Sequence, residues 1–181
     1  MSVVATALLA VAVATVPTGG GHGPHLVVQE RFGTSPKTAI TYDRASVPKG
    51  SRVVVAEWKQ KNGTTTVDLN VKGLDPKRTY GAHVHTKPCG TKPDDSGPHY
   101  QHVKDPVQPS VNPKYANSRN EVWLDFTTDA SGDGNAHSTV RWRFRQGEAR
   151  SVVIHEHATM TRPGHAGTAG ARLACVTVPF R

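Results

Sequence analysis

Nine short runs rich in β-branched and apolar residues, separated by turn signals, constrain the fold of this chain more than any other feature. The runs cover residues 25–32, 38–42, 52–58, 64–71, 80–85, 121–127, 137–144, 151–155 and 172–178. Several alternate polar and apolar residues, as in TVDLNV at 66–71, and a period of two predicts strands that bury one face. Gly- and Asn-containing turn signals at 61–63, 131–134 and 146–148 separate neighbouring runs. No helical period of any length is present.

This pattern predicts an all-β fold, an antiparallel sandwich or flattened barrel. The composition agrees, because Gly (17) and Pro (13) are plentiful and aromatic residues are few. A chain of 181 residues suffices for one domain with a real core. Two long segments, 86–119 and 156–170, interrupt the strands, and long ordered loops on a β scaffold usually carry function. We therefore expect two functional loops.

The first 16 residues are almost wholly apolar and small. This run is short for a membrane span, and Ala12-Val13-Ala14 matches the cleavage pattern of a secretory signal peptide. We predict a signal peptide at 1–14, a flexible linker at 15–24 and a β domain at 25–181. Because no Lys or Arg precedes the apolar run, a buried N-terminal strand or helix is the alternative. The prediction implies a secreted or extracytoplasmic protein with no stable membrane association after signal cleavage.

The net charge of +8 is compatible with several kinds of partner. Lys and Arg are scattered, with no run of five and no interleaved aromatic residues, so we expect no nucleic-acid partner. A positive field that attracts small anions fits the distribution better, and a merely solvated basic surface is the alternative. No apolar stripe indicates an oligomeric state.

The segment Gly81–His85 contains the first candidate metal-ligating residues. Side chains of a strand alternate between its faces, so His83 and His85 are expected to project from one face, with Val84 on the other. Two adjacent imidazoles are a ready pair of nitrogen ligands for copper or zinc. Paired surface histidines also occur by chance, so this pair is informative only together with the rest of the chain.

The chain has two cysteines, Cys89 and Cys175. One disulfide between them would suit an exported protein. Two unpaired buried thiols are the alternative if the chain stays in the cytosol.

Four segments in a fixed order resemble the copper/zinc superoxide dismutase family. They are GAHVHTKPC (81–89), GPHYQH (97–102), SVVIHE (151–156) and AGARLACV (169–176). The resemblance extends from about residue 52 to the C-terminus. It implies an eight-stranded antiparallel Greek-key β-barrel, in agreement with the strand count. It also implies copper-dependent dismutation of superoxide to dioxygen and hydrogen peroxide.

The resemblance assigns roles to individual residues. Arg172 matches the arginine that receives the superoxide anion, and a guanidinium suits this role because it stays charged. Cys89 and Cys175 match the family's disulfide. The copper ligands implied are His83, His85, His99 and His155, of which His99 matches the histidine that bridges copper and zinc. Neutral imidazoles suit both oxidation states of copper.

The zinc half of the family pattern is incomplete in this chain. Residues 120–125 stand where the last zinc histidine and aspartate are expected, and they contain no histidine. The chain thus resembles the copper-only branch, in which an acidic side chain can orient the bridging-type histidine. Asp125 and Glu121 are the candidates for that side chain. A rebuilt zinc site would use His99, His102 and Asp105.

Three functional hypotheses follow. The first is an exported copper-dependent superoxide dismutase, which Arg172 and the four histidines favour. The second is a copper-binding module that buffers the metal without efficient turnover, which the missing zinc ligands favour. The third, a metal-free β-sandwich adhesion module, requires the four histidines to be coincidental.

Overall fold

The computed structural model describes residues 23–33 and 38–181. The predicted signal peptide (1–14), and all of the predicted linker (15–24) except its last two residues, lie outside the described residues.

Nine strands and one short 3-10 helix make up the regular structure of the described ranges, and each strand overlaps one predicted run. They are β1 (Leu26–Arg31), β2 (Ala39–Thr41), β3 (Arg52–Lys59), β4 (Thr65–Lys72), β5 (Thr79–His85), η1 (Pro93–Ser96), β6 (Phe126–Thr127), β7 (Gly134–Val140), β8 (Ser151–His155) and β9 (Arg172–Thr177). A search of the described residues finds no helix with the length and apolar character needed to cross a membrane.

Two predicted runs differ from the observed strands. In the run 121–127, only β6 is a regular strand. Just before β6, a side chain takes the place of a backbone acceptor at the edge of β5. The Ala82 N–H donates to Asp125 Oδ1 (3.3 Å), where a ladder would supply a carbonyl. The run 137–144 begins earlier, at Gly134, and ends at Val140. Val140 pairs with the first residue of β4, so residues 141–144 have no strand beside them.

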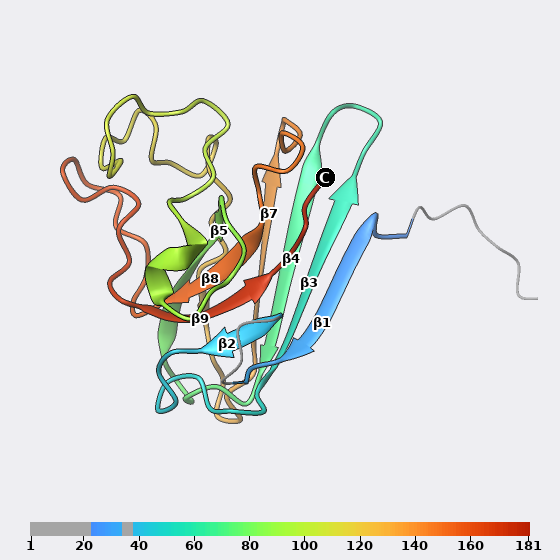
Figure 1. Ribbon diagram of the computed structural model, residues 1–181, viewed down its shortest axis with the longest axis vertical. Helices are drawn as coiled ribbons and strands as arrows, with labels where there is room; N and C mark the ends of the chain where they lie inside the picture. Colours follow the sequence, from blue (N-terminus) through green and yellow to red (C-terminus); the bar gives the residue numbers. More distant parts are fainter. Residues whose placement is uncertain (1–22, 34–37) are drawn as a thin grey trace, which may run out of the picture.

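The strands form two antiparallel sheets with the orders β1-β3-β4-β7 and β2-β9-β8-β5-β6. The chain leaves the first sheet after β4, forms β5 and β6, returns as β7 beside β4, and then leaves again to form β8 beside β5. This is Greek-key connectivity. Figure 1 shows the two sheets facing each other. The predicted flattened Greek-key fold is confirmed, with β2 as a short strand added to the expected eight.

The core lies between the sheets and follows the period-two pattern of the sequence. The first sheet contributes Val53, Val55, Val67, Leu69 and Val71, and the second contributes Ala82, Val84, Val152, Ile154, Ala174 and Val176. In β8, however, all five residues are buried. The outer face of the second sheet is therefore covered as well. Figure 1 shows the long loops 86–125 and 156–170 on this side, away from β3 and β4.

Candidate metal centre

The outer face of the second sheet carries the histidines of β5 and β8. His83 and His85 are fully buried on this face, while Val84 points into the core between the sheets, as the strand alternation predicts. His155 ends β8 and pairs with Gly81, beside a β-bulge.

The loop after β5 brings in a fourth histidine. The Thr86 N–H donates to the Pro98 carbonyl (3.0 Å), and the Tyr100 N–H donates to the Val84 carbonyl (2.8 Å). These bonds lay residues 98–100 along β5 near its C-terminal end, where His99 forms a bridge with His85. The His99 ring centroid lies 4.1 Å from that of His83.

The four histidines His83, His85, His99 and His155 form the one group in the described part of the chain that could hold a metal ion. Each offers one nitrogen, and these atoms lie within 4.8 Å of one another. The Nδ1 of His83 is buried and has no hydrogen-bond partner. An orphaned imidazole nitrogen costs free energy unless something else satisfies it, and a metal ion would do so. The residues present therefore fit a metal ion.

Burial also determines the charge state of the cluster. Removal from water lowers the pKa of His83 and of His85 well below the ordinary value, and the neighbouring histidines add to the effect. Burial lowers the pKa of His155 to about 3, again assisted by His99. The rings of His83, His85 and His155 are thus neutral and keep lone pairs to donate. Such a site therefore suits a metal ion better than it suits a proton.

Hydrogen bonds on the far side of the rings select the nitrogen that faces the centre. His85 Nδ1 bonds to the Gly97 carbonyl (2.8 Å), which leaves Nε2 to face His155 Nε2 at 3.3 Å. A carbonyl oxygen only accepts, so Nδ1 of His85 carries the ring proton.

Glu121 holds His99 in the same way. His99 Nδ1 donates to Glu121 Oε2 (2.9 Å), and Trp123 Nε1 donates to the same oxygen (2.7 Å). Gln101 Nε2 donates to Oε1 (2.7 Å). Glu121 is only 1% exposed, so three donors compensate the burial of its carboxylate. Of the two acidic candidates, the structure pairs His99 with Glu121.

The carboxylate of Asp125 lies near His83 instead of His99. Its Oδ1 lies 4.0 Å from His83 Nε2, and the hydroxyl of Thr159 lies between them. The sequence does not single out Thr159, because one threonine in a loop rich in Gly, Thr, His and Ala has no telling spacing.

His102 and Asp105 do not join His99. The His102 ring stacks on Trp142, with centroids 5.0 Å apart and planes 3° from parallel. The Asp105 carboxylate accepts from Ser110 Oγ (2.7 Å) and from the Val107 N–H (2.9 Å). In the part of the chain that the structure describes, these side chains assemble no second metal site.

Arg172 lines a cavity of about 370 Å³ together with His99, His155 and Gly170. Its Nη1 donates to the Pro93 carbonyl (3.1 Å) and to Ser96 Oγ (2.8 Å), so η1 holds the guanidinium in place. Burial lowers the pKa of Arg172, while the nearby Asp94 carboxylate raises it. A fixed cation thus stands at a cavity that reaches two of the four histidines.

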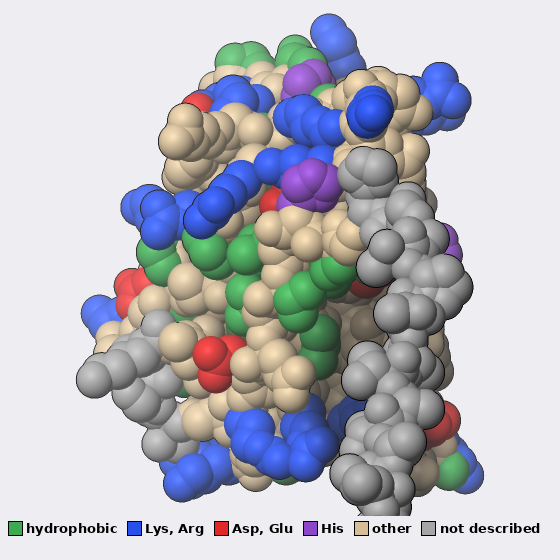
Figure 2. Space-filling model, turned by 90° about the vertical axis from the view of Figure 1, so that its right-hand side faces the viewer, with side chains coloured by type: hydrophobic (Ala, Val, Ile, Leu, Met, Phe, Trp, Pro, Cys, Tyr) green, Lys and Arg blue, Asp and Glu red, His purple; other side chains and the backbone are tan. Residues whose placement is uncertain are grey.

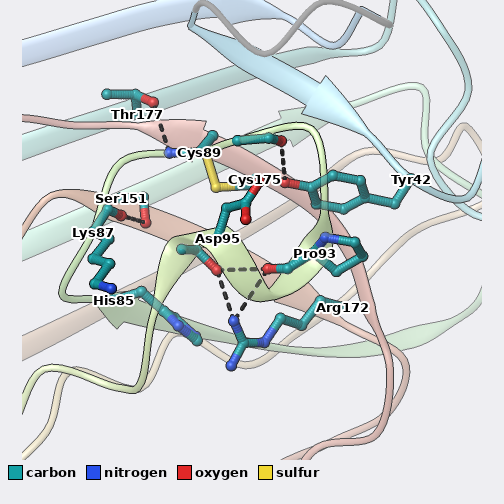
Figure 3. Close-up of a disulfide and its surroundings, with 12 residues drawn as sticks. Tyr42, His85, Lys87, Cys89, Pro93, Asp95, Ser151, Arg172, Cys175 and Thr177 are labelled. Carbon is teal, nitrogen blue, oxygen red and sulfur yellow. Dashed lines mark hydrogen bonds between the residues drawn. A yellow bond between two sulfur atoms is a disulfide. The ribbon is translucent and has the colours of Figure 1, made fainter.

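A disulfide anchors the segment that holds Arg172. Cys89 and Cys175 are bonded, with Cα atoms 5.7 Å apart, so the predicted pairing is confirmed. Figure 3 shows Cys89 and Pro93 on one loop, with Cys175 and Arg172 on the strand beneath it. The Cys89 N–H also donates to Thr177 Oγ1 (3.1 Å). The disulfide and the arginine therefore attach the same loop to β9.

The fold and the site together define a Greek-key β protein with a buried four-histidine centre suited to a transition metal ion. The model of one family, copper/zinc superoxide dismutase (SODC), matches residues 50–178. The chain belongs to the copper/zinc superoxide dismutase family, as its four motifs predict.

Solved structures with the same fold include two mutant forms of a SOD-like protein from Bacillus subtilis. Both are 18% identical to this chain; the double mutant has a TM-score of 0.54 and covers 71% of this chain and 90% of its own. The single mutant has a TM-score of 0.55, with 73% and 92% covered. The clock protein EA4 is 20% identical, with a TM-score of 0.56 and coverage of 84% and 99%. These likenesses concern the fold alone. A search of curated proteins finds no significant match.

Proposed function

We propose that this protein converts superoxide to dioxygen and hydrogen peroxide, using copper held by His83, His85, His99 and His155. The observation that carries the proposal is the convergence of four histidine nitrogens within 4.8 Å beside a cavity that Arg172 lines. The alternative is a copper-binding module that buffers the metal without efficient turnover.

Copper is the metal that this donor set favours. Four neutral nitrogen ligands suit both of its oxidation states, and copper, when bound, supplies one-electron oxidation and reduction. In the balanced reaction, one superoxide gives up an electron and becomes dioxygen. A second superoxide takes up that electron and two protons and becomes hydrogen peroxide.

The protein's own groups bind the anion and handle protons. The Arg172 guanidinium remains positive and offers directed N–H donors to a small anion. Its bonds to Pro93 and Ser96 keep it at the cavity without rearrangement. His99 keeps one proton on Nδ1 and donates it in a hydrogen bond to Glu121. Its Nε2 can then serve as a ligand or, while it is not a ligand, hold and release a proton near the reacting oxygen.

We place the protein in the copper-only mode of the family. A histidine that bridges two metals needs both ring nitrogens, and Nδ1 of His99 is bonded to Glu121. The different partners of His102 and Asp105 also support a centre that works without zinc. A secreted or extracytoplasmic location is part of the proposal, supported by the Cys89–Cys175 disulfide.

The test is the rate of superoxide decay with the metal-stripped protein, reloaded with one equivalent of copper and no zinc. We expect rapid, copper-dependent decay that exceeds the rate with the same copper held by a chelator. Tight copper retention without accelerated decay would contradict the enzyme and favour the copper-binding module.

Arg172→Gln separates these two functions. If the protein is an enzyme, the variant should retain copper with unchanged affinity while its rate with superoxide falls by about tenfold or more, because a steering charge is lost. Arg141→Gln is the matched control: it removes the same charge from an exposed position beyond the end of β7. An equal loss in both variants would assign the effect to net charge rather than to the site.

A further inference from the structure

Thr159 of the loop 156–170 connects a buried histidine to a carboxylate. Its Oγ1 lies 2.6 Å from His83 Nε2 and 2.6 Å from Asp125 Oδ1. Its backbone N–H donates to Asp125 Oδ2 (2.7 Å). The direct distance from Asp125 Oδ1 to His83 Nε2 is 4.0 Å, which is too long for a hydrogen bond. The hydroxyl is therefore the link between the two side chains.

The directions of these bonds determine the tautomer of His83. An ionised carboxylate only accepts, and a hydroxyl has one proton to donate. The Thr159 hydroxyl donates this proton to Asp125, so its oxygen must accept from His83 Nε2. In a neutral imidazole with its proton on Nε2, Nδ1 carries the lone pair. Nδ1 of His83 is also the buried atom that has no hydrogen-bond partner.

Close packing of the loop 156–170 against β5 fixes the position of Thr159. A Cβ added at Gly81 would lie 2.7 Å from the His157 carbonyl oxygen, 2.7 Å from the Ala169 Cβ and 3.4 Å from Thr159 Oγ1. Only glycine lets the loop approach β5 so closely. The loop is thus pressed against the strand that carries His83, and the Thr159 hydroxyl is held at the back of its ring.

We infer that Thr159 is a positioning residue for copper, which holds His83 with Nδ1 turned to the metal and transmits the charge of Asp125 to it. The inference rests on the copper centre proposed above. Groups bonded to the far nitrogen of a ligating histidine fix its orientation and raise its basicity. Here the hydroxyl is interposed, so the carboxylate acts on His83 through a neutral group instead of by direct contact.

The test compares Thr159→Val with Thr159→Ser in the full chain. Valine keeps the shape and removes the hydroxyl, so copper affinity, measured by competition with a chelator, should fall about 10- to 100-fold. The electron paramagnetic resonance spectrum of the Cu(II) form should change as His83 reorients. Serine restores the hydroxyl and should restore both the affinity and the spectrum.

Thr139→Val is the matched control, because it removes a hydroxyl that bonds to Thr66 (2.9 Å) on the other sheet. This variant should bind copper like the unaltered protein. Wild-type affinity and an unchanged spectrum in Thr159→Val would overturn the inference, and Thr159 would be a packing contact only.

A measurement on the unaltered protein decides the matter even if Thr159→Val does not fold. Nitrogen-15 NMR of the metal-free protein should show His83 with its proton on Nε2 and none on Nδ1. A proton on Nδ1 would overturn the inference. Since this measurement needs no copper, it separates a failure of the Thr159 link from a failure of the proposed copper centre, which would appear as loss of copper from the unaltered protein. Failure of the proposed activity would appear only in the superoxide decay rate.

Discussion

Glu57 is a buried carboxylate that lies outside the candidate metal centre. It is 1% exposed, and its Oε1 has no hydrogen-bond partner. Its Oε2 accepts from the Arg181 N–H (3.2 Å), and the Lys59 ammonium lies 3.7 Å from Oε1. Burial raises the pKa of Glu57 above its ordinary value, and the charge of Lys59 offsets only part of that rise.

We predict that Glu57→Gln stabilises the protein at neutral pH, because a neutral amide avoids the cost of burying a carboxylate charge. A carboxyl whose pKa is higher in the folded state holds its proton better there. The free energy of unfolding therefore falls as pH rises from the unfolded pKa through the folded pKa. Glu30, a partly buried glutamate of β1, provides the control. Urea unfolding at several pH values should show a smaller fall in the free energy of unfolding with pH in Glu57→Gln than in Glu30→Gln.

Glu121 is also a buried carboxylate, but both of its oxygens accept hydrogen bonds, whereas one oxygen of Glu57 accepts none. In Glu121→Gln, an amide NH₂ must face at least one of the donors from His99, Trp123 and Gln101. We predict a loss of about 1 to 3 kcal/mol in the free energy of unfolding and weaker copper retention. Urea unfolding of the metal-free protein measures the first effect, and Glu30→Gln is again the control. An unchanged stability would mean that Glu121 does not hold these three side chains together.

At the scale of elements, β9 is where the loop after β5 is anchored. It carries Cys175, bonded to Cys89, and Arg172, bonded to the carbonyl of Pro93 in η1. The loop in turn delivers His99 to the edge of β5. One strand thus carries the arginine that lines the cavity and anchors the segment that completes the histidine cluster.

We predict that replacing both cysteines by alanine lowers the free energy of unfolding by about 4 to 5 kcal/mol, since the crosslink closes a long loop. The two cysteines are 86 positions apart. Because the loop also holds the Arg172 guanidinium through Pro93 and Ser96, the rate with superoxide should fall as well. Urea unfolding of the double variant, and of the unaltered protein with and without reductant, measures the stability change. Equal stabilities would contradict an anchoring role.

At the scale of the whole molecule, the protein carries a net charge of +8. Figure 2 shows Lys and Arg gathered toward both ends of one face, with hydrophobic side chains between them. Such a surface produces a positive field at long range, whereas the charge of Arg172 lies at the cavity itself.

We predict that the rate with superoxide falls several-fold as ionic strength rises from about 0.01 M to 0.1 M, because the screening length shrinks from about 30 Å to about 10 Å. Superoxide decay at a series of salt concentrations provides the measurement. The Arg141→Gln variant should show a slightly smaller salt dependence. A rate independent of salt would show that the surface charge plays no part in capturing the anion.

Much of the fold could be predicted because it depends on local patterns. Alternation of period two places Val84 in the core and His83 and His85 on the opposite face. Turn residues separate the strands, and the four motifs identify the family. The run 121–127 was predicted less well, since whether it forms a ladder depends on what lies at the edge of β5.

The sequence by itself determined the two sheets, the pairing of Cys89 with Cys175 through the family resemblance, and the set of four histidines. Tertiary structure alone decided which acidic group serves which histidine: Glu121 bonds to His99, and Asp125 reaches His83 through Thr159. The physical reason is that these contacts join residues 22 to 76 positions apart in the chain. Their geometry depends on packing, such as the approach to Gly81, which leaves no periodic signal in the sequence.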